Sequence, residues 1–187
     1  MALRSDIGGK LTKALYVYIA PTPPLGFGVF ASRPWTAGDV IISDEDGSYF
    51  DLVMTYAELK ARGYDVHDDV VQVGHDAFIP ATGTVDDFMN HSCAPNCGVR
   101  LTPRGYQVVA LRDIARDEQL TYDYSTYMTA RYGELTCLCG APECRGKISG
   151  FETLSARLRK RYVTLGVAGD FAQEAAGMRP AAKTAAE

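Results

Sequence analysis

Three cysteines lie close together in the last third of the chain. Cys137, Cys139 and Cys144 are separated by one and by four residues, and Gly140 and Pro142 allow the loop between them to turn back on itself. Zinc prefers four ligands in a tetrahedron, and thiolate is one of its favoured ligands. A set of inert buried cysteines is the alternative, but core packing does not explain this spacing. We therefore expect a metal site that needs one more ligand.

Two other cysteines are candidates for that ligand. Cys93 and Cys97 complete the five cysteines of the 187-residue chain, and none lies before residue 93. An odd and clustered set argues against a framework of disulfides. The spacing alone does not choose between Cys93 and Cys97.

Three further motifs carry groups that can bind a ligand or act on one. Gly26-Phe-Gly28 precedes an expected strand, where glycine allows the main chain to approach a ligand. Asn90-His-Ser-Cys-Ala-Pro-Asn96 offers an amide and an imidazole, and Asp117-Glu-Gln-Leu-Thr-Tyr-Asp-Tyr124 ends on two phenols. Taken singly, each motif has an ordinary explanation, which is a turn, a satisfied core histidine or a pair of core aromatic residues.

Short strands must position these motifs. Runs of β-branched and aromatic residues predict strands over residues 15–19, 28–31, 39–43, 70–73, 77–79, 98–101, 106–111 and 119–124. Thr55 and Glu58 match a capping box and predict a short helix that ends at Gly63. Apolar residues at 151, 154, 158 and 162 predict a second helix over residues 151–163. We expect one mainly β domain with few short helices.

Composition limits the classes of partner. A hydrophobic content of 47% fits one globular domain, and a net charge of −4 disfavours direct binding of nucleic acid but is compatible with a basic protein partner. No apolar run approaches the roughly 18 residues of a membrane span, and the first residues lack the apolar core of a signal peptide. We therefore expect no membrane partner and an intracellular location, cytoplasmic or, in a eukaryote, nuclear.

In this order, the motifs resemble those of SET-domain protein-lysine methyltransferases, followed by a post-SET cysteine motif. The resemblance covers roughly residues 14–147. It implies a fold of several short-stranded sheets with a pseudoknot-like threading of the C-terminal part. On this basis we expect a SET domain over residues 14–125, a post-SET motif over 126–150, a C-terminal helical extension over 151–175 and a flexible tail over 176–187.

The resemblance implies S-adenosyl-L-methionine as the methyl donor. The segment Gly26-Phe27-Gly28 matches the glycine motif that lines the cofactor pocket. Asn90 and His91 match the pair that holds the amino-acid end and the adenine of the cofactor, and Leu138 matches a position that packs against the adenine.

The same resemblance implies one structural Zn²⁺. Cys93 matches the position that completes the tetrahedron with the three clustered cysteines, which are Cys137, Cys139 and Cys144. Cys97 is then a buried thiol without a role in metal binding.

Two tyrosines match the catalytic positions of the family. Tyr124 matches the catalytic tyrosine, whose hydroxyl would orient the ε-amine of a lysine in a protein substrate. Tyr122 matches a position that holds either Phe or Tyr and controls how many methyl groups are added. Side chains two residues apart on a strand face the same side, so both should border the lysine channel. With a phenol at this position we expect mainly monomethyl-lysine, with some dimethyl-lysine.

One departure and one alternative accompany this interpretation. Asp87 stands where the family often has an arginine that contacts the cofactor carboxylate, and Arg33 or Arg131 is the candidate replacement. The alternative function is a catalytically inactive SET fold that serves as a zinc-stabilised protein-binding module. The intact cofactor and tyrosine motifs favour the enzyme. Neither the substrate protein nor the oligomeric state follows from the sequence.

Overall fold

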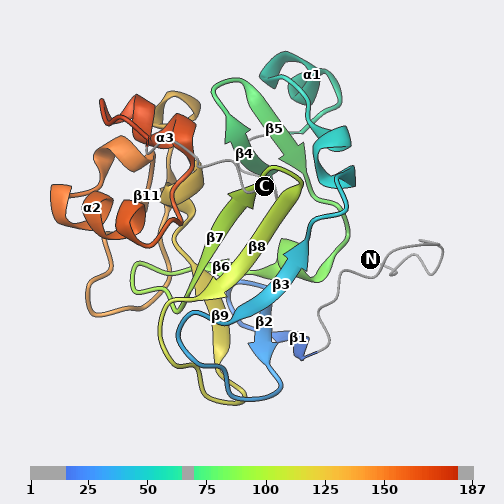
Figure 1. Ribbon diagram of the computed structural model, residues 1–187, viewed down its shortest axis with the longest axis vertical. Coiled ribbons are helices and arrows are strands. Elements are labelled where there is room, and N and C mark those ends of the chain that lie inside the picture. Colours follow the sequence, from blue (N-terminus) through green and yellow to red (C-terminus); the bar gives the residue numbers. More distant parts are fainter. Residues whose placement is uncertain (1–15, 65–69, 181–187) are drawn as a thin grey trace.

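The computed structural model describes residues 16–64 and 70–180 (Figure 1). Four of its strands form a sheet in the order β1-β2-β9-β6, and they are β1 (Val17–Pro21), β2 (Phe27–Ala31), β9 (Gln119–Tyr122) and β6 (Asn90–His91). β6 runs parallel to β9, whereas the other neighbours are antiparallel. This pairing brings the Asn-His motif beside the tyrosine motif, although about thirty residues separate them in the sequence.

A second sheet is antiparallel in the order β3-β8-β7. Its strands are β3 (Val40–Asp44), β8 (Gly105–Ala110) and β7 (Cys97–Thr102). Two short antiparallel pairs complete the β structure, namely β4 (Val70–Gly74) with β5 (Ala77–Pro80) and β10 (Leu135–Thr136) with β11 (Lys147–Ile148). The β10–β11 pair forms the base of the loop that carries the clustered cysteines.

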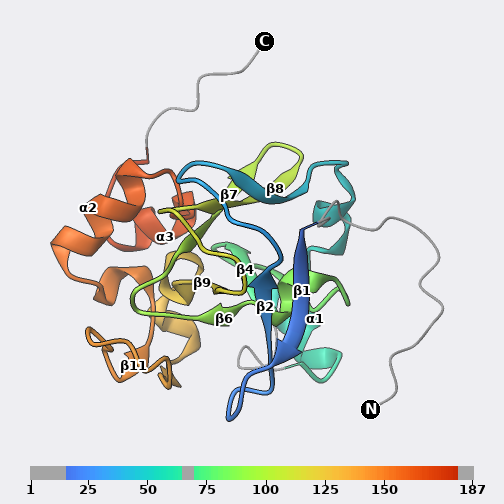
Figure 2. The ribbon, with the colours of Figure 1, turned by 90° about the horizontal axis from the view of Figure 1, so that it is seen from below.

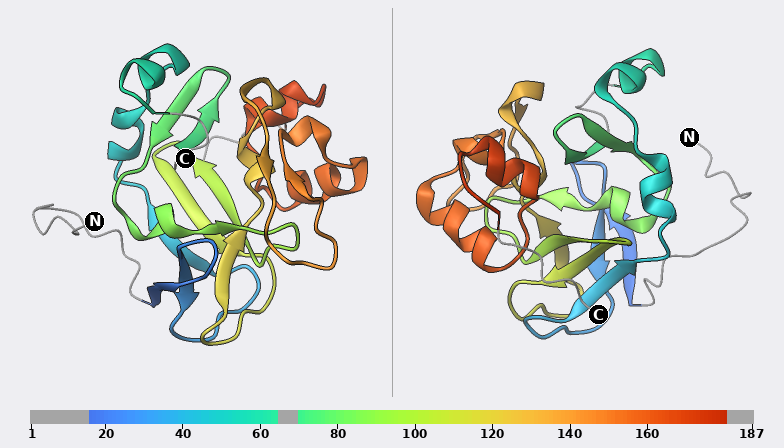
Figure 3. Two further views of the ribbon diagram at one scale, coloured as in Figure 1. Left: turned by 180° about the vertical axis from the view of Figure 1, so that it is seen from behind. Right: turned by 45° about the horizontal axis from the view of Figure 1, so that its top comes forward.

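The helices are short. The α-helices are α1 (Tyr56–Ala61), α2 (Ala156–Thr164) and α3 (Asp170–Ala175), and the 3-10 helices are η1 (Ser48–Leu52), η2 (Val85–Phe88), η3 (Tyr124–Tyr127), η4 (Ala130–Tyr132) and η5 (Phe151–Thr153). The predicted capping box of α1 is confirmed, because Thr55 and Glu58 each bond the other's backbone N–H. Figure 3 shows α2 and α3 on the opposite side of the molecule from α1. Among residues 16–64 and 70–180, every helix is too short or too polar to cross a lipid bilayer.

Two hydrophobic clusters hold these elements together. The first lies between the two larger sheets and includes Val29, Ile42, Cys97, Val108 and Leu120. The second lies under α2 and α3 and joins them to β8 and η3 through Val109, Tyr127, Tyr162, Val167 and Phe171. Figure 2 shows α2 and α3 against the same side of the molecule as β9 and β11. The C-terminal residues 151–175 are therefore packed into the body of the domain.

Local predictions were wrong at two places. The strand expected over residues 119–124 ends at Tyr122, because the Asp123 carboxylate accepts the Ser125 N–H and caps η3. The helix expected over residues 151–163 is divided into η5 and α2, because Ser155 caps the start of α2. The expected first strand begins at Val17. Three parts of the predictions lie outside the described residues, namely Leu15, the expected start of the SET domain at residue 14, and residues 181–187 of the expected tail.

Candidate active site

The glycine turn between β1 and β2 is tied to β6 by one amide. The Asn90 Nδ2 donates to the Phe27 carbonyl oxygen at 2.8 Å and to Thr22 Oγ1 at 3.3 Å. Asn90 also pairs through its backbone with β9. One residue therefore joins the glycine turn to the strand that precedes the tyrosines.

The two glycines of this turn are needed for different reasons. Gly26 has a φ of 83°, a left-handed conformation that favours glycine. At Gly28, an added Cβ would lie 2.9 Å from Thr22 Cγ2 and 3.0 Å from Asn90 Nδ2, and it would also collide with the Gln119 side chain. The turn thus needs glycine at position 26 for its backbone conformation and at position 28 for the close approach of neighbouring side chains.

Two large apolar side chains that the sequence assigns to the cofactor site are accessible. Phe27 is 53% exposed at the start of β2, and Leu138 is 60% exposed between two cysteines. Both side chains are therefore available for contact with a bound molecule.

His91 links the tyrosine segment to the cysteines. Its Nδ1 accepts the Tyr124 backbone N–H at 3.2 Å, and its Nε2 lies 3.3 Å from Cys93 Sγ. Burial lowers the pKa of His91 to about 4, with Asp123 opposing this shift and Arg145 adding to it. A neutral ring that accepts at Nδ1 carries its proton at Nε2. His91 therefore donates a hydrogen bond to the Cys93 sulfur.

Four cysteines gather in space. Cys93 Sγ lies 3.7 Å from Cys137 Sγ, which in turn lies 3.6 Å from Cys144 Sγ, and the Cys93 N–H donates to Cys139 Sγ at 3.5 Å. Zinc–sulfur bonds of about 2.3 Å in a tetrahedron place the sulfurs about 3.8 Å apart, so these separations suit zinc. Cys97 is fully buried in the first hydrophobic cluster instead.

The choice of the fourth donor lies between a ring nitrogen and a thiol. Ligand atoms of His91, Cys93, Cys137 and Cys139 lie within 4.8 Å of one another, and Cys144 adjoins this group through Cys137. Because the His91 Nε2 carries a proton, it has no free lone pair for a metal. The tautomer therefore favours a set of thiols.

The environment of the thiols makes a thiolate available for a metal. Burial opposes ionisation of Cys139, but hydrogen bonds from the Cys93 and Ala141 backbones and from neighbouring thiols outweigh it and lower the pKa of Cys139 to about 7. Burial raises the pKa of Cys137. Metals bind the thiolate form of cysteine, so a low pKa at one position favours metal binding.

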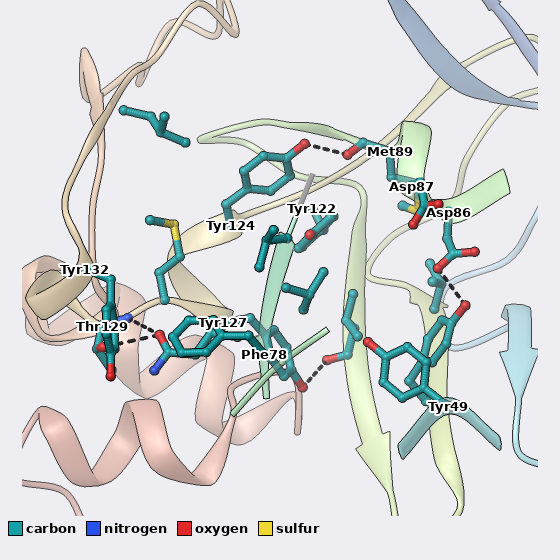
Figure 4. Close-up of a pocket in the computed structure, with 18 residues that line it drawn as sticks. Tyr49, Phe78, Asp86, Asp87, Met89, Tyr122, Tyr124, Tyr127, Thr129 and Tyr132 are labelled. Carbon is teal, nitrogen blue, oxygen red and sulfur yellow. Dashed lines mark hydrogen bonds between the residues drawn. The ribbon is translucent and has the colours of Figure 1, made fainter. Parts of the chain in front are cut away.

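Tyr122 and Tyr124 lie side by side. Their ring centroids are 4.8 Å apart, and the Tyr124 ring also meets the His91 ring edge-on at 5.4 Å. The Tyr124 hydroxyl donates to the Met89 carbonyl oxygen at 2.7 Å (Figure 4). The two phenols are thus neighbours as expected, but Tyr124 reaches this position from η3 and not from a continuing strand.

Both tyrosines border a cavity of about 130 Å³. Its wall is mostly apolar and aromatic, and the other tyrosines that line it are Tyr49, Tyr106, Tyr127 and Tyr132 (Figure 4). Burial raises the pKa of Tyr122 well above its ordinary value, and the neighbouring Tyr124 adds to this shift. The phenol of Tyr122 is therefore neutral, and the acidic groups of the cavity lining are Asp86 and Asp87.

Asp87 has a structural role in the turn before η2. Its carboxylate accepts the backbone N–H groups of Thr82 at 2.8 Å and Gly83 at 2.6 Å. Burial and the adjacent Asp86 raise the pKa of Asp87 to about 6. Asp86 itself accepts the Tyr106 hydroxyl at 2.6 Å. This end of the cavity is therefore acidic where the family often has a cation.

The two arginines considered as replacements stack on aromatic rings. The Arg33 guanidinium carbon lies 3.6 Å from the Trp35 ring centroid, and that of Arg131 lies 5.3 Å from the Tyr132 ring centroid. Neither belongs to the lining of the tyrosine cavity within residues 16–64 and 70–180. The replacement of the missing cation is therefore not evident in this part of the chain.

Sequence reasoning missed a buried ionic cluster behind the tyrosines. The fully buried Asp123 carboxylate accepts both Arg145 Nη atoms, at 2.9 and 2.7 Å, and the Tyr162 hydroxyl at 2.9 Å. Asp123 lies between the two tyrosines and Arg145 directly follows Cys144, so their places in these motifs could have indicated a role. Tyr162 lies beyond the motifs and carried none.

Known proteins provide an independent test of this interpretation. The family model of the SET domain matches residues 26–125, which is more than half of the 187 residues. The chain belongs to the SET-domain family. The matched segment of this SET domain contains the glycine turn, the Asn-His motif and both cavity tyrosines, and the cysteine cluster that follows it is consistent with a post-SET motif.

Curated relatives of this SET domain are much longer proteins. The chain is 33% identical over 140 residues to Histone-lysine N-methyltransferase ATX2 of Arabidopsis thaliana, which covers 68% of this chain and 12% of that protein. It is 42% identical over 84 residues to the H3 lysine-4 specific histone-lysine N-methyltransferase of Schizosaccharomyces pombe, covering 42% of this chain and 9% of that protein. The chain thus spans about a tenth of the length of these relatives.

A solved structure agrees with the fold. The crystal structure of KRYPTONITE in complex with mCHG DNA and SAH matches with a TM-score of 0.55 and 23% identity, covering 71% of this chain and 28% of that one. The predicted fold class is confirmed, because the SET domain consists of several short-stranded sheets with few short helices. The segment around Cys93 lies between β9 and the cysteine loop, as the pseudoknot-like threading predicts.

Proposed function

We propose that this SET domain transfers a methyl group from S-adenosyl-L-methionine to the ε-amine of a lysine in a protein. The observation that carries the proposal is the pair of Tyr122 and Tyr124 at a narrow cavity, with the Tyr124 hydroxyl held by the Met89 carbonyl. Met89 directly precedes Asn90 of the glycine-turn junction. The relatives are named histone-lysine methyltransferases, which supports a basic, histone-like substrate.

The chemistry requires a neutral amine. An ammonium has no lone pair, and the reference pKa of lysine is about 10.4, so the neutral form is rare at neutral pH. The apolar and aromatic part of the cavity lining disfavours the charged form, whereas the Asp86 and Asp87 carboxylates of the same lining favour it. The Tyr124 hydroxyl donates its proton to the Met89 carbonyl, and its oxygen would orient the amine as a hydrogen-bond acceptor. Alignment of the amine with the methyl group then supplies most of the rate.

The cofactor, when bound, supplies an electrophilic methyl group on its sulfonium. We assign its contacts to the segment Gly26-Phe27-Gly28, to Asn90 and His91, and to Leu138. The close packing at Gly28 and the exposed side chains of Phe27 and Leu138 fit such a ligand.

We assign one structural Zn²⁺ to Cys93, Cys137, Cys139 and Cys144. The sulfur separations of 3.6 and 3.7 Å support this set, and the His91 Nε2–H stabilises the Cys93 thiolate as a hydrogen-bond donor. Donors of this kind orient and tune metal ligands.

The remaining assignments are also proposals. The products are mainly monomethyl-lysine with some dimethyl-lysine, because Tyr122 is a phenol. The divisions are a SET domain over 14–125, a post-SET motif over 126–150, a helical extension over 151–175 and a tail over 176–187. Relatives named for histones favour a nuclear location in a eukaryote over a cytoplasmic one.

One experiment tests the proposed function. Purified protein is incubated with S-adenosylmethionine labelled on its methyl group and with a panel of basic proteins that includes histones. We expect label on lysine in at least one protein, located by mass spectrometry, and labelling slower on the order of 10²-fold with Tyr124→Phe. Tight binding of the cofactor without transfer to any protein would instead support the inactive binding module.

A further inference from the structure

We propose that Tyr162 of α2 is a positioning residue for methyl transfer, acting through Asp123 between the two cavity tyrosines. The inference rests on the proposed function and adds a residue from outside the matched SET segment, which ends at residue 125. It makes the C-terminal extension a part of the active site.

The contact between Tyr162 and Asp123 is buried on both sides. Tyr162 is 1% exposed, and its hydroxyl donates to Asp123 Oδ2 at 2.9 Å. The Asp123 side chain is 0% exposed, and Arg145 binds both of its carboxylate oxygens. A buried carboxylate needs several donors to offset its lost hydration. Its direction is therefore determined by Arg145 from the cysteine loop and by Tyr162 from α2.

The orientation of Asp123 decides how the chain leaves β9. Its Oδ1 accepts the Ser125 N–H at 3.1 Å, and its carbonyl oxygen accepts the Thr126 N–H at 3.0 Å. These bonds start η3, whose first residue is Tyr124. The Tyr124 N–H itself points to His91 Nδ1. A change at the carboxylate therefore moves the Tyr124 ring relative to the cofactor-side residues.

A second set of contacts braces η3 from the C-terminal side. The Gly169 N–H donates to the Thr126 carbonyl oxygen at 3.1 Å. Tyr127 packs in one hydrophobic cluster with Phe171 and Tyr162. The extension thus holds both ends of the short helix that carries Tyr124.

The test compares Tyr162→Phe with Tyr18→Phe. Each change removes a tyrosine hydroxyl that donates to an aspartate, since Tyr18 donates to Asp117 Oδ1 at 3.0 Å on the exposed β1. We expect Tyr162→Phe to lower kcat about tenfold through misplacement of Tyr124 and to change the ratio of monomethyl to dimethyl product. The KM for the cofactor and the zinc content should stay the same. Tyr18→Phe should match the wild type.

The product ratio separates positioning from a loss of folded protein. Partial unfolding reduces the number of active molecules but leaves the ratio of their products unchanged. A lower melting temperature with a wild-type ratio and a wild-type kcat per cofactor-binding site would overturn the inference. Should Tyr162→Phe fail to fold, Asp123→Asn keeps the size of the side chain that Tyr162 contacts but removes its charge, and an unchanged product ratio there would also overturn the inference.

A measurement that does not depend on methyl transfer separates this inference from the proposed function. If the wild type transfers no methyl group, the proposed function fails. The ¹³C NMR chemical shifts of the tyrosine rings then report whether Tyr124 has changed its position. We expect the Tyr122 and Tyr124 signals to shift in Tyr162→Phe and not in Tyr18→Phe. Identical cavity spectra in both variants would overturn the inference.

Discussion

At the scale of single residues, we expect the Tyr124 hydroxyl to orient the reacting amine. Tyr124→Phe retains the ring beside Tyr122 and removes the hydroxyl that bonds the Met89 carbonyl. We expect kcat to fall on the order of 10²-fold, as for other groups that orient a reacting proton or amine. Stability should fall by only about 1 kcal/mol, the usual net value of one hydrogen bond. Initial rates and thermal melts measure both, and near wild-type turnover would show that another residue orients the amine.

We propose that the neighbouring phenol, Tyr122, controls how many methyl groups are added. A tyrosine at position 122 can hold a hydrogen-bonded water beside the amine, and expelling that water without replacing its bonds is unfavourable. Tyr122→Phe removes the hydroxyl, so we expect more dimethyl- and trimethyl-lysine with turnover retained. Mass spectra of a reacted peptide measure the products. If the wild type already produces mainly trimethyl-lysine, Tyr122 does not have this role.

At the scale of elements, the glycine turn is a close junction of β1, β2 and β6. Gly28→Ala places a Cβ against Thr22 and Asn90, and overpacking of this kind costs about 1–3 kcal/mol. We expect cofactor affinity to fall at least about tenfold, because the junction must open to make room for the alanine side chain. Titration calorimetry with the cofactor measures the change.

Gly26→Ala is the matched control for the turn. An added Cβ there meets nothing within 4 Å, so its only cost is the strain of its positive φ, about 1–2 kcal/mol. We expect a smaller loss of cofactor affinity than in Gly28→Ala. The reverse order would mean that the conformation of the turn matters more than its contact with Asn90.

We expect the cysteine loop to depend on a bound metal. Zinc binding contributes directly to the folding of such loops. Cys139→Ser should therefore release the zinc and weaken cofactor binding through the loss of order around Leu138. Cys97→Ala should do neither, because Cys97 lies in the first hydrophobic cluster. Metal analysis and cofactor titration test both variants, and a metal-free protein that binds cofactor normally would contradict the assignment.

At the scale of the whole molecule, we expect the C-terminal extension and the SET core to unfold as one cooperative unit. Phe171 of α3 is 5% exposed and packs with Tyr127 of η3. Phe171→Ala should lower the free energy of unfolding by about 3–5 kcal/mol. Leu52→Ala, on a side chain that is 44% exposed, should change it by less than about 0.5 kcal/mol. A core transition that is unaffected by Phe171→Ala in a chemical unfolding experiment would show that the extension folds separately.

The sequence by itself determined the features that depend on near neighbours. The capping box of Thr55 and Glu58, the turn at Gly26 and the short strands follow from local conformational preferences, and the structure has them. The three clustered cysteines indicated a metal loop for the same reason, since their spacing alone limits where their sulfurs can meet. The family resemblance added the roles of residues that no local pattern assigns.

The tertiary structure decided what depends on distant pairs. Asn90 meets the glycine turn, and Cys93 meets Cys137, only because β6 runs parallel to β9 beneath the cysteine loop. Tyr162 reaches Asp123 across 39 residues by packing α2 on the second hydrophobic cluster. Burial makes such contacts strong, but burial is set by the whole fold and leaves no periodic signal near either residue. For this reason the tyrosine motif was evident in the sequence and the residue that holds it in place was not.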